Sequence, residues 1–405
     1  MKKAMLIILL LMSVNAYTQS YSYHKAQLHC HSTNSDGAMN PATMAQEYIN
    51  RGYEIVCLTD HNYMTPANTY SQSGLVTINS EELTFDKHMN GWFLNHTIDA
   101  TGYTPQQAID SVRAQGGLIQ FNHPVIAPST TFPFYSDWSY TYSQFMALQN
   151  GPDMIEVHNA GTDLLGATFN MAIWDSLLMS NRKTWGTSTD DMHDLTTGYL
   201  IPTIDIGWVM IRLNTLSPDS VRAALLRGDF YGSNGVEISN YTVNGNTINI
   251  SSTNATTIKF IGDWGQLLTE VTGSTATFTR TTQRYVRIEL EKAGILGVGA
   301  KYAFTQPVFF DNTGVGNDNG FKPNLTSYPN PCNNKINICF NTEKKSDVII
   351  EIYDITGKKI TTVNKSIQQD GYNEIPVDVT KLNPGVFIYT ININGLMTTN
   401  KFTKL

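Results

Sequence analysis

The residues best suited to chemistry are nine histidines, all of which fall between positions 24 and 193 of the 405 residues. His29 and His31 are two apart in an extended segment, so they point to the same side and can both reach one metal ion. Asp36, Glu82 and Asp191 add carboxylates. A set of imidazoles and carboxylates without thiolates suits zinc, manganese or iron.

Most of these groups follow short apolar runs that we predict to be strands. His29 and His31 end the run 25–30, Asp60 and His61 follow 54–58, His123 follows 118–121, His158 follows 154–157, and Asp191 and His193 follow 183–186. Expected helices alternate with these strands and begin at Asn40, Thr104, Leu164 and Ser217. Alternating strands and helices predict a parallel α/β sheet or barrel, whose strand ends bring the groups together at one edge.

Three polar residues have alternative interpretations at this stage. Asp60 is either a ligand or a carboxylate that orients a metal-binding histidine. His24 and His96 have no acidic or imidazole neighbour at ligand spacing, so we interpret them as ordinary hydrogen-bonded residues.

Five motifs, LHCHSTNSDG, TDHN, EELTFDKHMN, FNHP and TSTDDMH, resemble in order those of the PHP (polymerase and histidinol phosphatase) superfamily. The resemblance covers about residues 23–235 and implies a distorted (β/α)7 barrel whose mouth holds two or three divalent metals, zinc, manganese or iron. It implies one metal on His29, His31, Glu82 and Asp191, a second on Glu82, His88 and His123, and a third on Asp36, His61 and His193. Glu81 leaves the identity of the bridging glutamate open, and Lys87 stands where the family usually has glycine.

The rest of the chain predicts further domains. We expect a signal peptide over 1–19, the PHP domain over 20–235, a small all-β domain over 236–311, a linker over 312–326 and a β-sandwich over 327–405. The small domain resembles one appended in the carbaryl-hydrolase-like subgroup. The segments YPNPCNNKINI, IYDITGKKI, LNPGVFIYT and KFTKL resemble the C-terminal sorting domain of type IX secretion, which implies that machinery as a partner and a secreted or cell-surface location.

Outside the signal peptide, no stretch approaches the ~18 consecutive apolar residues that a membrane helix needs, so no transmembrane segment is expected in the mature form. A disulfide between Cys332 and Cys339, which flank a short strand-like segment, is left open.

The favoured function is hydrolysis of small phosphate mono- or diesters by a metal-activated water. His158, His193 and Asp191 form the predicted catalytic set, with either histidine protonating the leaving oxygen. Residues 20–200 carry six basic against 17 acidic residues, which argues against duplex nucleic acid and favours a small-molecule ester. Two alternatives remain: a carboxylic or carbamate ester hydrolase with the same metal site, and a surface binding module with a relic barrel.

Overall fold

The computed structural model describes residues 21–124, 140, 142–149, 151–160, 171–180, 183–195, 204–294, 299–310 and 325–405, the last range with gaps at 329, 343–344, 356–357, 368–370 and 394–395. The predicted signal peptide and nearly all of the predicted linker lie outside the described residues. Among the helices of the described ranges, none is long and apolar enough to cross a membrane.

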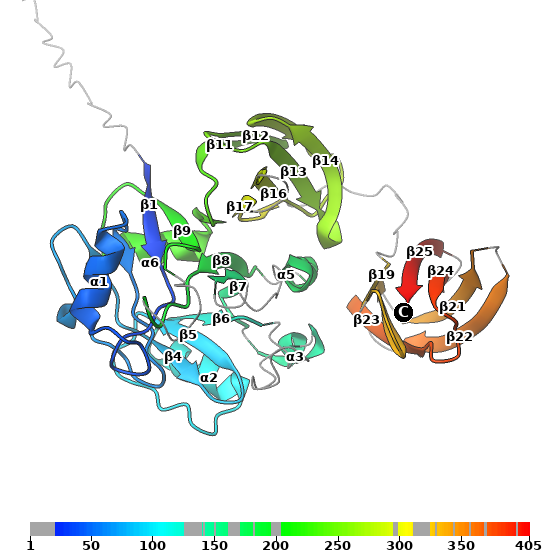
Figure 1. Ribbon diagram of the computed structural model, residues 1–405, viewed down its shortest axis with the longest axis horizontal. Coiled ribbons are helices and arrows are strands. Elements are labelled where there is room, and N and C mark those ends of the chain that lie inside the picture. Colours follow the sequence, from blue (N-terminus) through cyan, green and yellow to red (C-terminus); the bar gives the residue numbers. More distant parts are fainter. Residues whose placement is uncertain are drawn as a thin grey trace, which may run out of the picture.

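In the described residues up to position 310 the chain forms three sheets, and two of them carry the histidine-bearing segments (Figure 1). The larger follows the order β14, β13, β16, β17, β10, β9, β1, β2, β3, with β18 beside β16. Its strands are β1 (Ser22–Gln27), β2 (Ile55–Val56), β3 (Val76–Thr77), β9 (Trp208–Leu213), β10 (Phe230–Ser233), β13 (Thr257–Gly262), β14 (Gln266–Thr272), β16 (Tyr285–Lys292), β17 (Lys301–Thr305) and β18 (Val308–Phe309). The smaller contains β4 (Ser80–Thr84), β5 (His88–Trp92), β6 (Leu118–Phe121), β7 (Met154–Asn159) and β8 (Trp185–Thr189).

Strand direction differs within each sheet. The pairs β1–β2 and β2–β3 are parallel, as are β6–β7 and β7–β8. In contrast, β4, β5 and β6 pair antiparallel, and β1 pairs antiparallel with β9. The mixed α/β class is therefore confirmed, but the β4–β5 hairpin departs from the alternation that a (β/α)7 barrel requires. The seven-unit barrel remains a proposal.

Helices cover the outer faces of these sheets. They are α1 (Pro41–Ile49), α2 (Pro105–Ala114), α3 (Tyr142–Ala147), α5 (Met171–Met179) and α6 (Pro218–Arg227), with 3-10 turns η1 (Ala67–Thr69) and η2 (Asp263–Gly265). The side chains of Asn40, Thr104 and Ser217 cap α1, α2 and α6, as predicted. The predicted start of the third expected helix, at Leu164, lies outside the described residues, and α5 covers the second half of that helix.

The carboxyl ends of the strands meet between the two sheets. Asp191 N donates to His29 O at 3.0 Å and His31 N to Met192 O at 2.8 Å, which joins the segment after β1 to the segment after β8. Glu82 N donates to Asp60 O at 3.0 Å, which joins β4 to the segment after β2. These backbone bonds bring the histidine-bearing segments together.

The larger sheet continues past residue 235, where we placed a domain boundary. β10 pairs with β17, and β17 leads through β16 to β13 and β14. A second antiparallel sheet of β11 (Ile238–Asn244), β12 (Thr247–Ser252) and β15 (Thr275–Thr279) packs against it through a shared apolar cluster. The expected antiparallel β structure is present here, and it is hydrogen-bonded directly to the first half of the chain.

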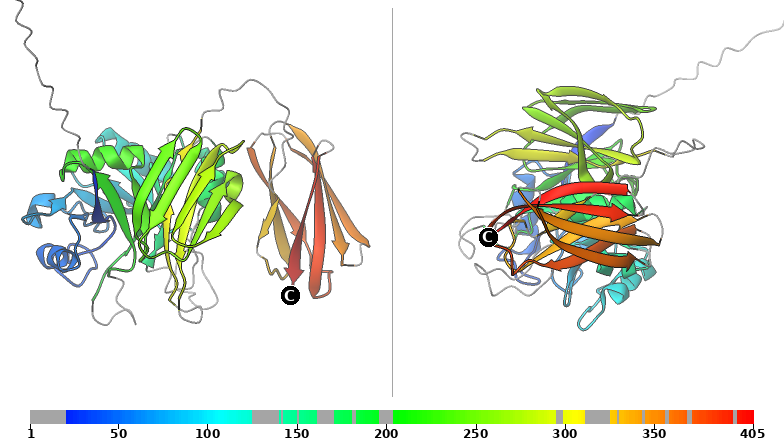
Figure 2. Two further views of the ribbon diagram at one scale, coloured as in Figure 1. Left: turned by 90° about the horizontal axis from the view of Figure 1, so that it is seen from above. Right: turned by 90° about the vertical axis from the view of Figure 1, so that its right-hand side faces the viewer.

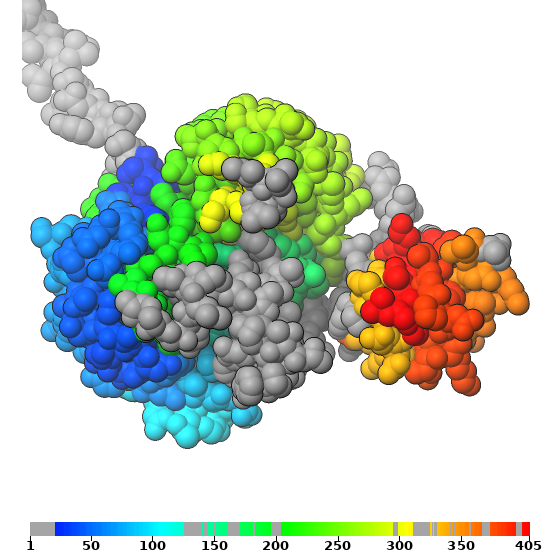
Figure 3. Space-filling model, viewed as in Figure 1, coloured from blue at the N-terminus to red at the C-terminus, as the bar shows by residue number. Residues whose placement is uncertain are grey.

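Residues 325–405 form a separate lobe of two antiparallel sheets (Figures 2 and 3). One contains β19 (Thr326–Tyr328), β20 (Lys335–Thr342) and β23 (Gly371–Asp378); the other contains β21 (Ser346–Asp354), β22 (Lys359–Ile367), β24 (Gly385–Ile393) and β25 (Leu396–Lys404). Their facing side chains form an apolar core drawn from this lobe alone. Cys332 and Cys339 are buried free thiols, so the disulfide that the sequence left open is absent from the structure.

Candidate metal centre

All nine predicted metal ligands lie among the described residues, around the meeting point of the two sheets. His29 and His31 follow β1, Asp36 lies in the turn after them, His61 follows β2, Glu82 is on β4, His88 begins β5, His123 follows β6, and Asp191 and His193 follow β8. The predicted strand 25–30 ends at Gln27, so both histidines of the first motif lie beyond the strand itself.

Glu82 occupies the middle of the cluster. Its Oε1 atom lies 3.2 Å from His88 Nδ1 and 3.4 Å from His29 Nε2. Its Oε2 atom lies 3.0 Å from His61 Nδ1 and 3.5 Å from His31 Nε2. His123 Nε2 is also within reach, so this buried carboxylate faces five imidazoles and is placed to bridge two adjacent cations.

Glu81, the other candidate for this role, points the opposite way because consecutive residues of a strand alternate between faces. Its Oε1 atom accepts the backbone N–H of Ile98 at 2.9 Å. Burial raises the pKa of Glu81 to about 8. The geometry therefore favours Glu82 as the residue that faces the metal centre.

His29, His31 and Asp191 bring three ligand atoms to one point. The two Nε2 atoms are 3.3 Å apart, and Asp191 Oδ1 lies 3.1 Å from His29 Nε2 and 3.2 Å from His31 Nε2. Two ligand atoms that bind one zinc ion tetrahedrally at 2.0–2.1 Å are separated by about 3.3 Å. The spacing and chemistry of these donors fit a divalent metal.

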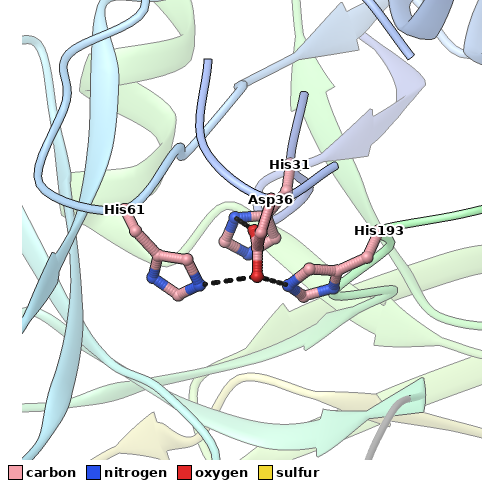
Figure 4. Close-up of side chains that lie close together, drawn as sticks. All are labelled: His31, Asp36, His61 and His193. Carbon is pink, nitrogen blue, oxygen red and sulfur yellow. Dashed lines mark ion pairs between the residues drawn. The ribbon is translucent and has the colours of Figure 1, made fainter. Parts of the chain in front are cut away.

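Asp36 joins a second set of imidazoles at the outer edge of the cluster (Figure 4). Its Oδ2 atom lies 3.5 Å from His61 Nε2 and 3.4 Å from His193 Nε2, and its Oδ1 atom lies 3.7 Å from His31 Nδ1. The Asp36 side chain is 53 % exposed, whereas that of His31 is fully buried. This set is therefore the part of the centre that solvent reaches.

The ligand atoms form three overlapping groups, each with all atoms within 4.8 Å of one another. The groups are His31, Asp36, His61 and His193; His29, His31 and Glu82; and His61, Glu82 and His88. They follow the three predicted sets with three differences: Asp191 is absent from the group of His29, His31 and Glu82, His31 joins the outer group, and His61 takes the place predicted for His123. His123 Nε2 lies nearby, 3.6 Å from Glu82 Oε1.

Mutual electrostatics outweigh burial in the pKa values of His29 and Glu82, whereas burial is the largest cause that lowers the pKa of His31 and of His88. Burial lowers the pKa of His29, but Asp191, Glu82 and Glu156 outweigh burial and hold it well above its usual value. Burial raises the pKa of Glu82, but His88, His29 and His61 outweigh it and hold that pKa well below the usual value. The Glu82 carboxylate therefore favours its ionised form, which is the form that can bind a metal ion.

The backbone is strained at two ligands. His123 has φ of 28° and Asp191 has φ of 52°, in the region that side-chain-bearing residues avoid. Their N–H groups are both held, that of His123 by Glu156 Oε2 at 2.5 Å and that of Asp191 by His29 O at 3.0 Å. Such strain concentrates at functional sites, where surrounding bonds maintain it.

Sequence reasoning missed the residues that hold the ligands in place. Asn122 Nδ2 donates to Glu82 Oε1 at 2.7 Å, Thr84 Oγ1 lies 2.6 Å from His61 Nδ1, and Glu156 Oε1 lies 2.8 Å from His29 Nδ1. The signal for Glu156 was a charged residue inside an otherwise apolar strand.

Asp60, in contrast, orients no histidine through the bonds seen here. It accepts from Ser32 N at 2.7 Å, Ser35 Oγ at 2.9 Å and Thr65 Oγ1 at 2.5 Å. The interpretation of Asp60 as a histidine-orienting carboxylate was therefore wrong. Its role is to hold the loop that carries His31 and Asp36.

His158, a predicted catalytic residue, is not brought into the three ligand groups. Its Nδ1 atom lies 2.8 Å from Ser188 Oγ, which itself donates to Ser233 O. Thr187 and Thr189 bond to Gln120 and Glu156, on one face of the smaller sheet. Ser188 lies between them in β8 and points to the opposite face, so its partner His158 lies on that opposite face as well. His193 and Asp191, the other predicted catalytic residues, are both in the cluster.

The two histidines interpreted as ordinary lie elsewhere. His24 Nδ1 pairs with Glu54 Oε2 at 2.9 Å, an acidic partner that sequence spacing did not predict. The His96 backbone bonds to Gln115, and neither histidine belongs to a ligand group among the described residues.

Two family models match parts of the chain. The PHP domain family matches residues 27–86, and the secretion system C-terminal sorting domain matches residues 326–404. An uncharacterized protein of Methanocaldococcus jannaschii is 30 % identical over 116 residues, which span 25 % of this chain and 67 % of that protein. The chain therefore belongs to the same family as that protein and carries a PHP domain. The sorting domain makes it a protein secreted to the cell surface or beyond.

Two solved structures resemble the chain in outline. A two-domain protein from Bacteroides vulgatus, described as containing a predicted PHP-like metal-dependent phosphoesterase, is 16 % identical with a TM-score of 0.41 and covers 86 % of this chain and 96 % of that one. An amidohydrolase from Chromobacterium violaceum with bound sulfate and no metal is 14 % identical with a TM-score of 0.31, and covers 42 % of this chain and 87 % of that one.

Proposed function

We propose that the protein is a secreted hydrolase that cleaves small phosphate mono- or diesters with a metal-activated water. One observation carries the proposal: three overlapping groups of imidazole and carboxylate atoms share His31, His61 and Glu82. Shared ligands place neighbouring cations close together, which is the arrangement used for in-line displacement at phosphorus.

The residues divide into an inner and an outer part. In the inner part, one ion would be held by His29, His31, Glu82 and Asp191. A second would be held by Glu82, His88 and either His61 or His123. In the outer part, a third would be held by Asp36, His193 and either His61 or His31. Bound divalent ions supply Lewis-acid polarisation and a water of lowered pKa. The outer group is the partly exposed one, so the ester approaches there.

His193 is the residue of the predicted catalytic set best placed to move a proton. Its side chain is 17 % exposed, and its Nε2 atom faces Asp36 Oδ2. Nε2 can either bind an ion or donate a proton to the leaving oxygen, so these two roles of His193 exclude each other. Asp191 orients His29 and His31 through Oδ1 and supports the centre in either case.

The expected substrate is small. Residues 20–200 are strongly acidic by composition, and a long polyanion would need many lysine and arginine contacts to bind there. We infer a nucleotide, a sugar phosphate or a short phosphodiester, and not a duplex nucleic acid.

The test combines metal analysis with three chromogenic esters. Purified protein is assayed with p-nitrophenyl phosphate, bis-p-nitrophenyl phosphate and 1-naphthyl acetate, with Asp191→Asn as the site variant and His24→Ala as a surface control. Turnover of a phosphate ester that Asp191→Asn loses and His24→Ala keeps supports the proposal. Turnover of the acetate ester alone would indicate the carboxylic or carbamate esterase, and bound metal without hydrolysis would indicate a binding module.

A further inference from the structure

Glu156 is a fully buried carboxylate beside the metal centre, and none of the three ligand groups includes it. Its Oε1 atom accepts from His29 Nδ1 at 2.8 Å and from Thr189 Oγ1 at 2.5 Å. Its Oε2 atom accepts from the backbone N–H of His123 at 2.5 Å and from Asn159 Nδ2 at 2.9 Å. This one side chain on β7 thus bonds to three other elements: the segment after β1, the segment after β6, and β8.

The bond to His29 decides which of its ring nitrogens faces the metal centre. A neutral imidazole carries one proton, and a proton on Nδ1 that is donated to Glu156 leaves the lone pair on Nε2. That Nε2 atom lies 3.1 Å from Asp191 Oδ1 and 3.4 Å from Glu82 Oε1. The carboxylate therefore selects the tautomer of His29 that can bind a cation.

The bonds of Oε2 extend the same control to two further ligands. Asn159 Nδ2 donates both to Glu156 and, at 3.2 Å, to Asp191 Oδ2, which leaves Asp191 Oδ1 directed at the imidazoles. The N–H of His123 is held in a backbone conformation with φ of 28°. Three predicted ligands from separate segments thus depend on one buried group.

We propose that Glu156 is the positioning residue of the metal centre, which sets the His29 tautomer and the directions of Asp191 and His123. The inference rests on the metal-binding part of the proposed function and is independent of which ester is cleaved. A carboxylate that orients a metal-binding histidine typically contributes 10–100-fold to metal affinity.

Glutamine cannot replace this carboxylate, although it has the same shape. Both oxygens of Glu156 accept from N–H groups, so either orientation of a glutamine amide would direct its NH2 group at a donor. The sharpest variant is therefore Glu156→Gln, which removes one acceptor and leaves no cavity. Glu81→Gln is the matched control, because Glu81 is an equally buried glutamate that faces Ile98 and not the cluster.

The experiment titrates the chelator-treated full chain with Zn²⁺ against a competing chelator, and repeats the titration with Co²⁺ to record its visible spectrum. We expect Glu156→Gln to lose 10–100-fold in affinity at one ion and to alter the Co²⁺ spectrum. Glu81→Gln should match the wild type in both. Unchanged affinity and spectrum in Glu156→Gln would overturn the inference.

A second measurement requires no folded variant. In the metal-loaded wild type with ¹⁵N-labelled histidine, NMR should show His29 protonated at Nδ1 and not at Nε2. A proton on Nε2 would overturn the inference. If the wild type binds no divalent metal, the proposed function fails. If the wild type and Glu156→Gln both bind metal with the same affinity, only the proposed role of Glu156 fails.

Discussion

Two buried clusters of charge in the first 310 residues balance their charge in different ways. Around Arg287, which is 1 % exposed on β16, Nε and Nη2 each lie 2.7 Å from an oxygen of Asp175 on α5. Tyr285 Oη donates to Asp175 as well, at 2.7 Å. Guanidinium and carboxylate pair in a bidentate manner, so this cluster is complete within the chain.

The metal centre has the opposite composition. Among the residues that the structure describes, no lysine or arginine forms an ion pair with Asp36, Glu82 or Asp191, and the ion-pair partners of these carboxylates are all imidazoles. Imidazole carries a full charge only when protonated, and a protonated nitrogen cannot bind metal. A cluster with a permanent cation serves to join parts of a fold, whereas one without such a cation is suited to take up an ion.

The largest expected effect comes from removing a shared ligand. His31→Ala takes an atom from two of the three ligand groups, so the loss of hydrolysis should exceed the ~100-fold typical of an outer-shell change. Metal content and turnover with phosphate esters measure it, and His24→Ala should keep both. Full metal content and turnover in His31→Ala would show that the cluster is not the active centre.

Breaking the self-contained cluster should affect stability. Arg287→Met leaves Asp175 buried without its guanidinium partner, which typically costs about 3–5 kcal/mol of unfolding free energy. Urea unfolding measures this, with Arg227→Met in the exposed Arg227–Asp229 pair as a control expected to change by about 1 kcal/mol or less. Equal losses in both variants would contradict the distinction between them.

Removing metal should destabilise only the lobe that holds the incomplete cluster. A ligand present at 100 times its dissociation constant stabilises the folded state by about 2.7 kcal/mol, and a chelator reverses this. Calorimetry with and without EDTA should therefore lower the transition of residues 21–310. The transition temperature of the sorting lobe, residues 325–405, should not change, because its core is apolar. A change in that transition alone would contradict the placement of the metal centre in residues 21–310.

The smallest effect is expected from Glu81→Gln. Glu81 is buried next to Glu82 in sequence but bonds Ile98, and the oxygen of a glutamine can still accept that N–H, so metal content should be unchanged and stability should fall by about 1 kcal/mol or less. Metal analysis and urea unfolding measure both quantities. Loss of a metal ion in this variant, with Glu82→Gln unaffected, would reverse the assignment of the bridging glutamate.

Much of the centre could be predicted because metal ligands need particular side chains at particular spacings. His29 and His31, the Asp36 turn and the Asp191–His193 pair were all found in this way, and the structure brings them together. The helix starts at Asn40, Thr104 and Ser217 were equally accessible, since capping depends on local residues alone.

Other features depended on which strands pair and which face each side chain takes. The local sequence pattern did not predict the β4–β5 hairpin. Its antiparallel pairing makes the smaller sheet mixed, where alternating strands and helices had predicted a parallel one. The same hairpin sets the register that directs Glu82, and not Glu81, at the cluster. His158 shows most clearly what sequence spacing alone does not determine. Its position at the end of a strand predicted a catalytic residue, but in the structure its side chain points towards Ser188.

Residue types and spacing were sufficient to indicate a histidine-rich centre in the first half of the chain, a β-sandwich at its end and an acidic environment unsuited to polyanions, and the resemblance of the tail to a known family added its sorting role. Folding in three dimensions directed Glu82, and not Glu81, at the histidines, turned His158 towards Ser188 and brought Glu156 into contact with His29 and His123. The reason is physical. Ligand chemistry and capping act over a few residues, whereas the orientation of a buried carboxylate is set by long-range pairing between strands that are distant in the chain.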